Sequence, residues 1–217
     1  PALHDLEVGA ALGRADAAMR EVKQAGRAGF RFHTQRSQAG DADLRTRMQL
    51  DHAMRQALTQ QRFRLHYQPQ VDLATGTVIG AEALIRWRDP ELGEVPPGRF
   101  IPVAEESGFI VAIGDWVLRQ AVAQAAQWHA SGMPMRMSVN VSALQFRQPG
   151  FVDGVASTLR AAGLPGRLLE LELTESILIQ DAQEALHRLQ ALARLGVKLA
   201  IDDFGTGYSS LAYLRKL

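Results

Sequence analysis

The chain has 217 residues and a mass of 23.8 kDa, enough for one domain with a substantial core and a smaller appendage. Its 24 Lys and Arg residues nearly balance its 23 Asp and Glu residues, so composition indicates no general attraction to DNA, RNA or anionic membranes. No apolar run reaches the roughly 20 residues of a membrane span. There is no cysteine, which excludes disulfides and thiolate metal sites and agrees with a reducing cytoplasm.

The N-terminal segment predicts one helix and a short strand, followed by a second helix. In ALGRADAAMREVKQAGRAGFRF, apolar residues recur at helical spacing before a glycine stop: Leu12, Ala15, Met19 and Val22. TQRSQAGDAD is interpreted as a polar link that leads into a helix from about Leu44 to Gln60. We therefore divide the chain into an N-terminal segment 1–35, a linker helix 36–62 and a main domain 63–217.

From Phe63 onwards the pattern becomes β/α. The strands RLHYQPQVDL and TVIGAEALIRW are separated by a short turn that favours an antiparallel hairpin. DPELGEVPPGRF predicts a loop, and IPVAEESG and FIVAIGDWVLRQAVAQAAQWHASG predict helices. The strands RMSVNVS, LLELELTES and VKLAIDDFG alternate with the helices FVDGVASTLRAAG and DAQEALHRLQALARLG. This alternation predicts an α/β fold of the TIM type, a (β/α)8 barrel.

The barrel is expected to be incomplete in this chain. A closed eight-stranded barrel needs about 200 residues or more, and fewer remain after Phe63. The expected fold is therefore a TIM-type barrel truncated after about five strands. Because such a sheet has an exposed edge, we expect the 217-residue chain on its own to aggregate and to be inactive.

Four oxygen-bearing side chains stand at the C-terminal ends of strand-like runs: Glu82, Asn140, Glu172 and Asp202. The steps from Asn140 to Glu172 and from Glu172 to Asp202 are about 30 residues, the length of one β/α unit. Parallel strands of a β/α barrel deliver such positions to one rim, where active sites are built. Carboxylates and a carboxamide there favour Mg²⁺, Mn²⁺ or Ca²⁺ over zinc. Asp203, next in sequence, adds a candidate ligand for a second ion.

The ligand within LLELELTES has competitors. Glu170 shares the parity of Glu172 but falls one pleat earlier, deeper along the barrel axis, where we expect it to pair with a basic group. Glu175 lies in the following loop. Asn140 lies among apolar residues of its strand, which predicts that its side chain is buried. A buried amide needs polar partners, and coordination of a metal ion by its oxygen would supply one.

The segments GAEALIRW, SVNVS, LELTES and AIDDFGTGYSSLAYL resemble successive signature segments of the EAL domain, a family of phosphodiesterases that hydrolyse the bacterial second messenger cyclic di-GMP. HYQPQVDL and GRFIPVAEESG fit in the same order, so the resemblance runs from about Phe63 to the last residue. The second EAL tripeptide, Glu184-Ala185-Leu186, follows no predicted strand and is interpreted as ordinary helix. Segment 1–35 resembles the C-terminal end of a GGDEF domain. The GGDEF signature itself is absent from this chain, so the resemblance implies no cyclase activity here.

The resemblance implies hydrolysis of cyclic di-GMP to the linear dinucleotide pGpG with two Mg²⁺ or Mn²⁺ ions, and inhibition by Ca²⁺. The metal ligands that it implies are Glu82, Asn140, Glu172, Asp202 and Asp203. The catalytic residues that it implies are Glu82, Asp202, Asp203 and Glu175, the last by bracing the loop after the fifth strand. Arg86 and Gln68 would bind the nucleotide, with Gln70 as a competitor for Gln68, and a guanidinium can hold two phosphate oxygens at once.

The resemblance also implies a homodimer through the loop after the fifth strand. The expected partner is cyclic di-GMP rather than DNA or RNA, and the expected location is the cytoplasm, with any membrane anchor in N-terminal domains outside this chain. A lysine and a glutamate that the family uses fall beyond Leu217. Two main functions stay open, a phosphodiesterase and a catalytically silent cyclic di-GMP receptor; an unrelated metal-dependent barrel such as an aldolase is a weaker third. Retention of Glu82 and the Asp pair favours the phosphodiesterase.

Overall fold

The computed structural model describes residues 35–174, 177 and 182–202, with side chains from residue 44 onwards. The chain divides into two compact units, residues 1–50 and residues 51–217. Helix α2 (Gln35–Thr59) begins in the first unit and ends in the second. The predicted polar link is therefore wrong from Gln35 onwards, because TQRSQAGDAD contains helix-favouring Gln, Arg and Ala and no proline. The helix and strand predicted before it lie outside the described residues.

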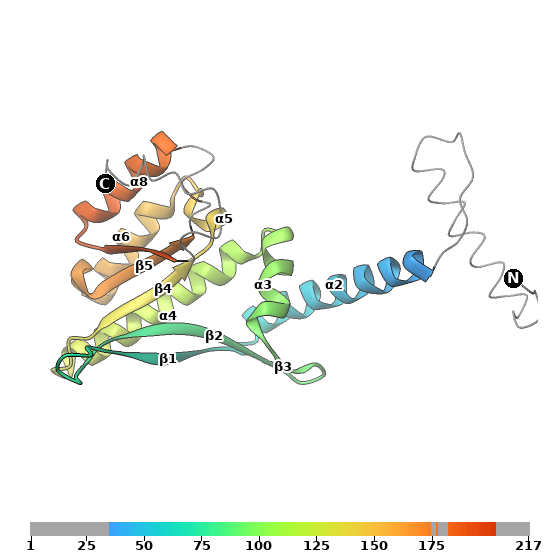
Figure 1. Ribbon diagram of the computed structural model, residues 1–217, viewed down its shortest axis with the longest axis horizontal. Coiled ribbons are helices and arrows are strands. Elements are labelled where there is room, and N and C mark those ends of the chain that lie inside the picture. Colours follow the sequence, from blue (N-terminus) through green and yellow to red (C-terminus); the bar gives the residue numbers. More distant parts are fainter. Residues whose placement is uncertain (1–34, 175–176, 178–181, 203–217) are drawn as a thin grey trace, which may run out of the picture. The chain divides into compact units, whose positions relative to one another are not determined.

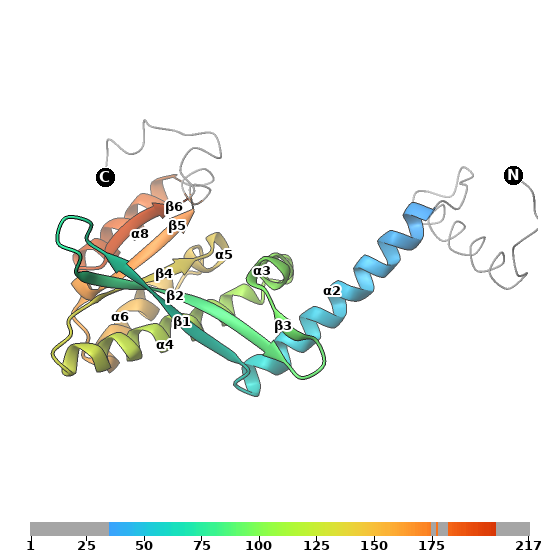
Figure 2. The same ribbon diagram turned by 60° about the horizontal axis from the view of Figure 1, so that its bottom comes forward.

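The second unit is built on one sheet with the strand order β1-β2-β4-β5-β6 and with β3 paired to β2 outside this path. β1 (Phe63–Val71) and β2 (Val78–Asp89) form the predicted antiparallel hairpin, a long ribbon in Figure 2. β4 (Arg136–Val141), β5 (Leu169–Thr174) and β6 (Lys198–Asp202) follow, each parallel to the strand before it in this order. A mostly parallel α/β sheet confirms the predicted fold class.

Strand β3 (Gly93–Val95) lies in the segment that the sequence predicted to be a loop throughout. It pairs antiparallel with the end of β2, so the loop prediction is wrong there. Asp89 closes the turn between the two strands, because its Oδ1 accepts hydrogen bonds from the backbone N–H groups of Glu91 and Leu92 at 3.0 and 3.2 Å. A three-residue strand held by one such turn is too short to show an alternating pattern.

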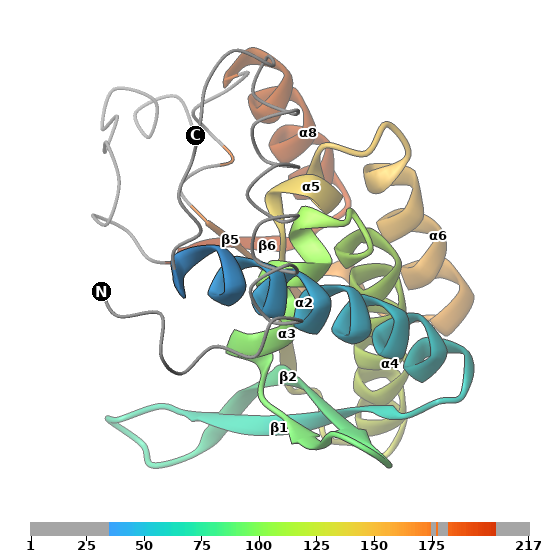
Figure 3. The ribbon, with the colours of Figure 1, turned by 90° about the vertical axis from the view of Figure 1, so that its right-hand side faces the viewer.

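The helices that connect these strands are α3 (Pro97–Glu106), α4 (Ile110–Ala130), α6 (Phe151–Ala162) and α8 (Ala182–Arg194). They correspond to the four helical segments predicted between β2 and β6, except that α3 begins at Pro97, inside the predicted loop, because proline is well suited to the first position of a helix. In Figures 1 and 3, α4, α6 and α8 lie along one side of the parallel strands. Two shorter elements, α5 (Ala143–Phe146) and the 3-10 turn η1 (Gly166–Leu168), were not predicted. Within the described part of the chain, no helix combines the length and hydropathy needed to cross a membrane.

An aromatic cluster closes the end of the sheet where β1 begins and β2 ends. The ring centroid of Phe63 lies 5.6 Å from that of Trp87, 5.8 Å from Phe100 and 6.0 Å from Trp116. Phe63, Trp87 and Phe100 are buried, so the cluster joins β1 and β2 to α3 and α4. This packing fixes the helices that form one wall of the site described next.

Candidate functional site

The strand register places the predicted ligands in neighbouring rows of the sheet. Glu82 on β2 pairs with Ser138 on β4. Asn140, two residues later on β4, pairs with Glu172 on β5. Asp202 is the last residue of β6 and lies one pleat further along. Asn140, Glu172 and Asp202 are therefore near the carboxyl ends of their strands, as predicted. Glu82 is not, because β2 continues for seven residues beyond it to Asp89, and only its register with β4 brings it beside the others.

Glu82 and Asn140 are in direct contact, since Asn140 Nδ2 donates a hydrogen bond to Glu82 Oε1 at 2.7 Å. Asn140 is exposed, whereas its apolar neighbours had predicted a buried amide. That prediction was wrong because side chains alternate along a strand. Val139 and Val141 are buried on one face, and Asn140 projects from the other.

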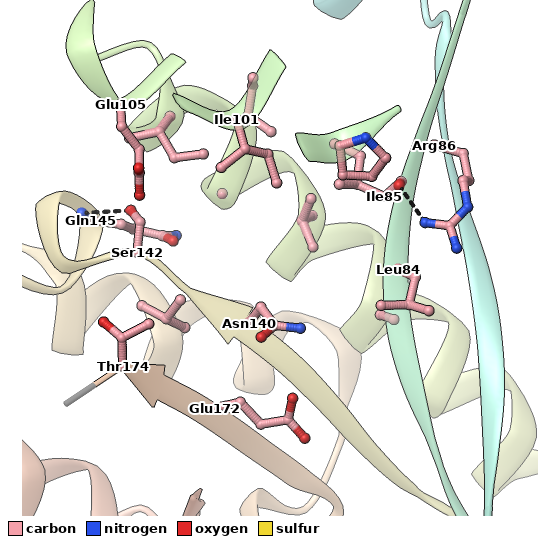
Figure 4. A pocket seen from close by; sticks show the side chains of 17 residues that line it. Leu84, Ile85, Arg86, Ile101, Glu105, Asn140, Ser142, Gln145, Glu172 and Thr174 are labelled. Atoms are coloured by element: carbon pink, nitrogen blue, oxygen red, sulfur yellow. Dashed lines mark hydrogen bonds between the residues drawn. The ribbon is translucent and has the colours of Figure 1, made fainter. Parts of the chain in front are cut away.

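Glu172 lies half-buried on β5 and points, with Asn140, toward β2 in Figure 4. Burial raises the pKa of Glu172 above its ordinary value, and the negative charge of Glu82 raises this pKa further. A hydrogen bond with Ser138 lowers it, and the charge of Asp202 raises it. The carboxylates of Glu82 on β2, Glu172 on β5 and Asp202 on β6 therefore disfavour one another's charge, and a bound cation would relieve this.

The donor set fits Mg²⁺ or Mn²⁺ by its chemistry, since carboxylate and carboxamide oxygens are hard ligands. Among the described residues, however, no three His, Cys, Asp or Glu side chains stand close enough together to hold a metal ion. A ligand role for Asn140 requires its amide to turn, because its nitrogen rather than its oxygen faces Glu82. Asp203 and Glu175, which complete the predicted set, lie outside the described residues.

The two glutamines of β1 are placed differently. Gln68 lies opposite Glu82 in the hairpin register and is exposed. Gln70 lies opposite Gly80, and its Nε2 donates a hydrogen bond to Ser138 Oγ at 3.2 Å. Gln68 therefore stands beside Glu82 with its side chain accessible, which favours it over Gln70 for contact with a ligand.

A cavity of about 280 Å³ lies at this rim, between the strand ends and helices α3 and α4 (Figure 4). Arg86, Asn140 and Glu172 line its polar side, and Arg86 Nη1 donates to the backbone oxygen of Ile85 at 2.9 Å. Its other wall is apolar and includes Leu84, Ile85, Pro97, Ile101, Ile110 and Ile113. Sequence reasoning missed this wall, because apolar residues on β2, α3 and α4 that face a cavity have the same sequence pattern as residues that face a core.

Two further acids have partners of their own. Glu170 Oε2 lies 3.3 Å from Arg136 Nε, which confirms the basic partner predicted deeper along the barrel axis. Glu184, in the second EAL tripeptide, lies on α8, and its Oε1 accepts a hydrogen bond from Arg188 Nε at 2.8 Å. The second tripeptide is therefore part of a helix surface, as predicted.

The sequence matches the EAL domain family over residues 51–217. It is 45% identical over 204 residues to the bifunctional diguanylate cyclase/cyclic di-GMP phosphodiesterase MucR of Pseudomonas aeruginosa, covering 94% of this chain and 29% of MucR. It is 45% identical over 159 residues to the cyclic di-GMP phosphodiesterase PA2567 of the same organism, covering 73% of this chain and 27% of PA2567. The chain thus spans less than a third of the length of these relatives.

The solved structures with a similar fold include the PaMucR phosphodiesterase in complex with c-di-GMP, with a TM-score of 0.74 and 48% identity over 78% of this chain and 69% of that one. The EAL enzyme Bd1971 with cAMP and cyclic di-GMP bound has a TM-score of 0.75 and 30% identity over 99% of this chain and 56% of that one. EAL domains are TIM-like barrels, in agreement with the predicted fold. Sequence and structure together show that the chain belongs to the EAL domain family.

Proposed function

We propose that this chain is part of a metal-dependent phosphodiesterase that hydrolyses cyclic di-GMP to pGpG. The observation that carries the proposal is the gathering of Glu82, Asn140 and Glu172 at one rim, beside a cavity that Arg86 also lines. Relatives at 45% identity are named cyclic di-GMP phosphodiesterases, which supports a hydrolase of this class.

In this proposal the oxygen-bearing side chains hold one or two Mg²⁺ or Mn²⁺ ions: Glu82, Asn140, Glu172, Asp202 and Asp203. Such an ion, when bound, would lower the pKa of a water molecule and neutralise charge on the phosphoryl oxygens. Glu175 braces the loop that follows β6, the fifth of the strands predicted from the sequence.

Arg86 and Gln68 orient the nucleotide in this proposal. The Arg86 guanidinium suits a phosphate because it can donate two parallel hydrogen bonds. The apolar wall that includes Leu84, Ile101 and Ile113 faces the same cavity. A purine base has a flat apolar surface, and such a wall could remove that surface from water.

A cyclic di-GMP receptor without turnover is the second candidate. The observation in its favour is the orientation of the Asn140 amide. Its nitrogen donates to Glu82 Oε1, so the two oxygens that would bind a metal ion do not face each other. The solved Xanthomonas citri FimX EAL domain in complex with c-di-GMP has a similar fold, with a TM-score of 0.70 and 25% identity over 82% of this chain and 68% of that one.

A cleavage assay in different metal ions distinguishes these candidates. We expect the full-length protein that contains this chain to convert cyclic di-GMP to pGpG in Mg²⁺ or Mn²⁺, as measured by chromatography of the nucleotides. In Ca²⁺ we expect binding and little turnover, because Ca²⁺ is a poorer Lewis acid with looser geometry. Binding without cleavage in all three ions would support the receptor, and equal cleavage rates in Ca²⁺ and Mg²⁺ would contradict the metal assignment.

The proposal includes a homodimer that forms through the loop after β6, the fifth predicted strand, and this loop lies outside the described residues. It also places the protein in the cytoplasm with no nucleic-acid partner, in keeping with the absence of cysteine and with the formal net charge of +1. Light scattering coupled to size exclusion would test the dimer.

A further inference from the structure

Two arginines lie directly opposite each other near the start of β1 and the end of β2. Arg64 on β1 pairs with Arg86 on β2 in the antiparallel register, on the same face of the ribbon as the pair of Gln68 and Glu82. Side chains paired in this way have Cβ atoms about 4.5–5.5 Å apart. Figure 4 shows the Arg86 side chain between the ribbons of β2 and β1, next to the cavity that it lines. Arg64 is therefore a neighbour of the candidate site, although the sequence did not predict it there.

The arginines on either side of this pair have acidic counterparts. Arg62 Nη1, just before β1, lies 3.1 Å from Asp89 Oδ2, and Arg88 pairs across the ribbon with Glu94 of β3. Opposite charges in such positions stabilise a sheet, whereas like charges directly opposite each other are destabilising. A contribution to folding therefore does not explain why two arginines face each other between these compensated positions.

Neither arginine of the pair has a carboxylate partner among the residues that the structure describes. Arg86 Nη1 donates to the backbone oxygen of Ile85 at 2.9 Å. Arg64 is exposed and has no hydrogen bond, ion pair or ring contact within the described part of the chain. Two neighbouring guanidinium groups without carboxylates are suited to an anion with several oxygen atoms, because each can donate two parallel hydrogen bonds.

We propose that Arg64 is a second nucleotide-binding arginine, which together with Arg86 holds the phosphate of cyclic di-GMP that is not cleaved. This inference rests on the proposed function and adds a ligand contact to it. A cyclic dinucleotide carries two phosphodiester groups, and the cleaved one would be neutralised at the metal site, so the other needs a cation from the protein. The arginine pair lies four residues along β2 from Glu82, or about 13 Å of extended strand, and can therefore meet a different part of the ligand.

The test is the affinity of the full-length protein for cyclic di-GMP, measured by calorimetry in Ca²⁺, where we expect little turnover, and by steady-state kinetics in Mn²⁺. We expect Arg64→Ala to weaken binding and to raise KM by about tenfold or more, with kcat nearly unchanged, because hydrogen bonds to a charged group are lost. Arg64→Lys keeps the charge and should lose less affinity. Since salt screens exposed charges, KM should rise less steeply with ionic strength in Arg64→Ala than in the wild type.

The matched control is Arg160→Ala, which removes an exposed arginine from α6, outside the cavity. Affinity that is unchanged in Arg160→Ala, reduced in Arg64→Ala and partly kept in Arg64→Lys would support the role of Arg64. Equal affinities of Arg64→Ala and the wild type would overturn it. If Arg64→Ala instead lowers the midpoint of urea unfolding and leaves KM unchanged, Arg64 pairs with a carboxylate elsewhere in the full-length protein and the inference is wrong. A wild-type protein that binds no cyclic di-GMP would overturn the proposed function, and the inference with it.

Discussion

At the scale of single residues, Glu82 on β2 interacts with groups on two other strands of the site. It accepts a hydrogen bond from Asn140, and its charge raises the pKa of Glu172 on a different strand. Arg86, four residues later on the same strand, lines the cavity without contacting these acids in any described hydrogen bond or ion pair. The two residues therefore have separable roles, one in holding a cation and one in holding a phosphate.

Substitution should separate these roles. We expect Glu82→Ala to abolish turnover in Mn²⁺, because a metal ligand is lost. Arg86→Ala should mainly raise KM, by about tenfold to a hundredfold, since a hydrogen bond to a charged group contributes about 1.5–3 kcal/mol. Steady-state kinetics of cyclic di-GMP cleavage would show the difference.

The control for this pair is the second EAL tripeptide. Glu184 is 52% exposed and forms an ion pair with Arg188 across one helical turn, so Glu184→Ala should change stability by less than about 1 kcal/mol and leave turnover intact. A strong loss of activity in Glu184→Ala would mean that the site has been assigned to the wrong tripeptide.

At the scale of elements, Asp89 holds the end of β2 to its neighbours. Its side chain is 5% exposed, and Oδ2 lies 3.1 Å from Arg62 Nη1, just before β1. Burial acts to raise the pKa of Asp89, but the N–H groups of Glu91 and Leu92 and the charge of Arg62 outweigh it, so the net pKa is lowered. The ionised carboxylate thus stabilises the hairpin and the turn to β3 together.

A lowered pKa has a defined consequence for stability. The contribution of Asp89 is fully present above the ordinary aspartate pKa of about 3.9 and is lost as pH falls through the lower pKa of the folded state. We expect Asp89→Asn to lower the free energy of unfolding by about 1–3 kcal/mol at pH 7, and by less at pH 3. Urea titrations at both pH values measure this.

Asp153→Asn on the exposed first turn of α6 is the matched control, with a small effect expected at either pH. A deficit in Asp89→Asn that is the same at pH 3 as at pH 7 would show that the charge of Asp89 does not stabilise the fold.

The long elements of this fold follow from local pattern, while the short ones depend on individual hydrogen bonds. Helices and strands differ in apolar period, so β4, α6 and β5 could be predicted in order. Helix α5 could not, because it is one turn long and begins where Ser142 Oγ accepts a hydrogen bond from the Gln145 N–H at 3.2 Å.

The candidate site was predictable to the same extent. Strand parity placed Glu82 and Glu172 at one rim, but it gave no means of seeing that Ile101 and Ile113 face a cavity rather than a core. Their surroundings come from β2 and β4, far away in sequence.

At the scale of the whole molecule, the second compact unit and the family match both begin at residue 51, within the predicted linker helix 36–62. The last turns of α2 therefore belong to the barrel unit. Met54 has 0% exposure, and the Arg55 guanidinium carbon lies 4.6 Å from the ring centroid of Phe109.

If these turns are part of the unit, removing a buried side chain there should destabilise it. In the full-length protein, we expect Met54→Ala to lower the free energy of unfolding of the unit that contains residues 51–217 by about 2–5 kcal/mol, as for other buried methionines. Met133→Ala, at a side chain that is 50% exposed, should have a small effect. Chemical denaturation would measure both, and equal effects of the two substitutions would show that α2 is not integral to the barrel unit.

The direction of β1 determines at which rim of the sheet the main chain enters, relative to the cavity. Because β1 runs against β2, its first residue, Phe63, pairs with Trp87 near the end of β2. In an all-parallel barrel every strand begins at the rim opposite the active site, whereas here the main chain enters at the same rim as the cavity. Phe109, which Arg55 covers, directly precedes Ile110 of the cavity wall. The last turns of α2 therefore lie next to the cavity, with the Phe109 ring between Arg55 and the cavity wall. A small shift of these turns would reach the cavity through that one ring.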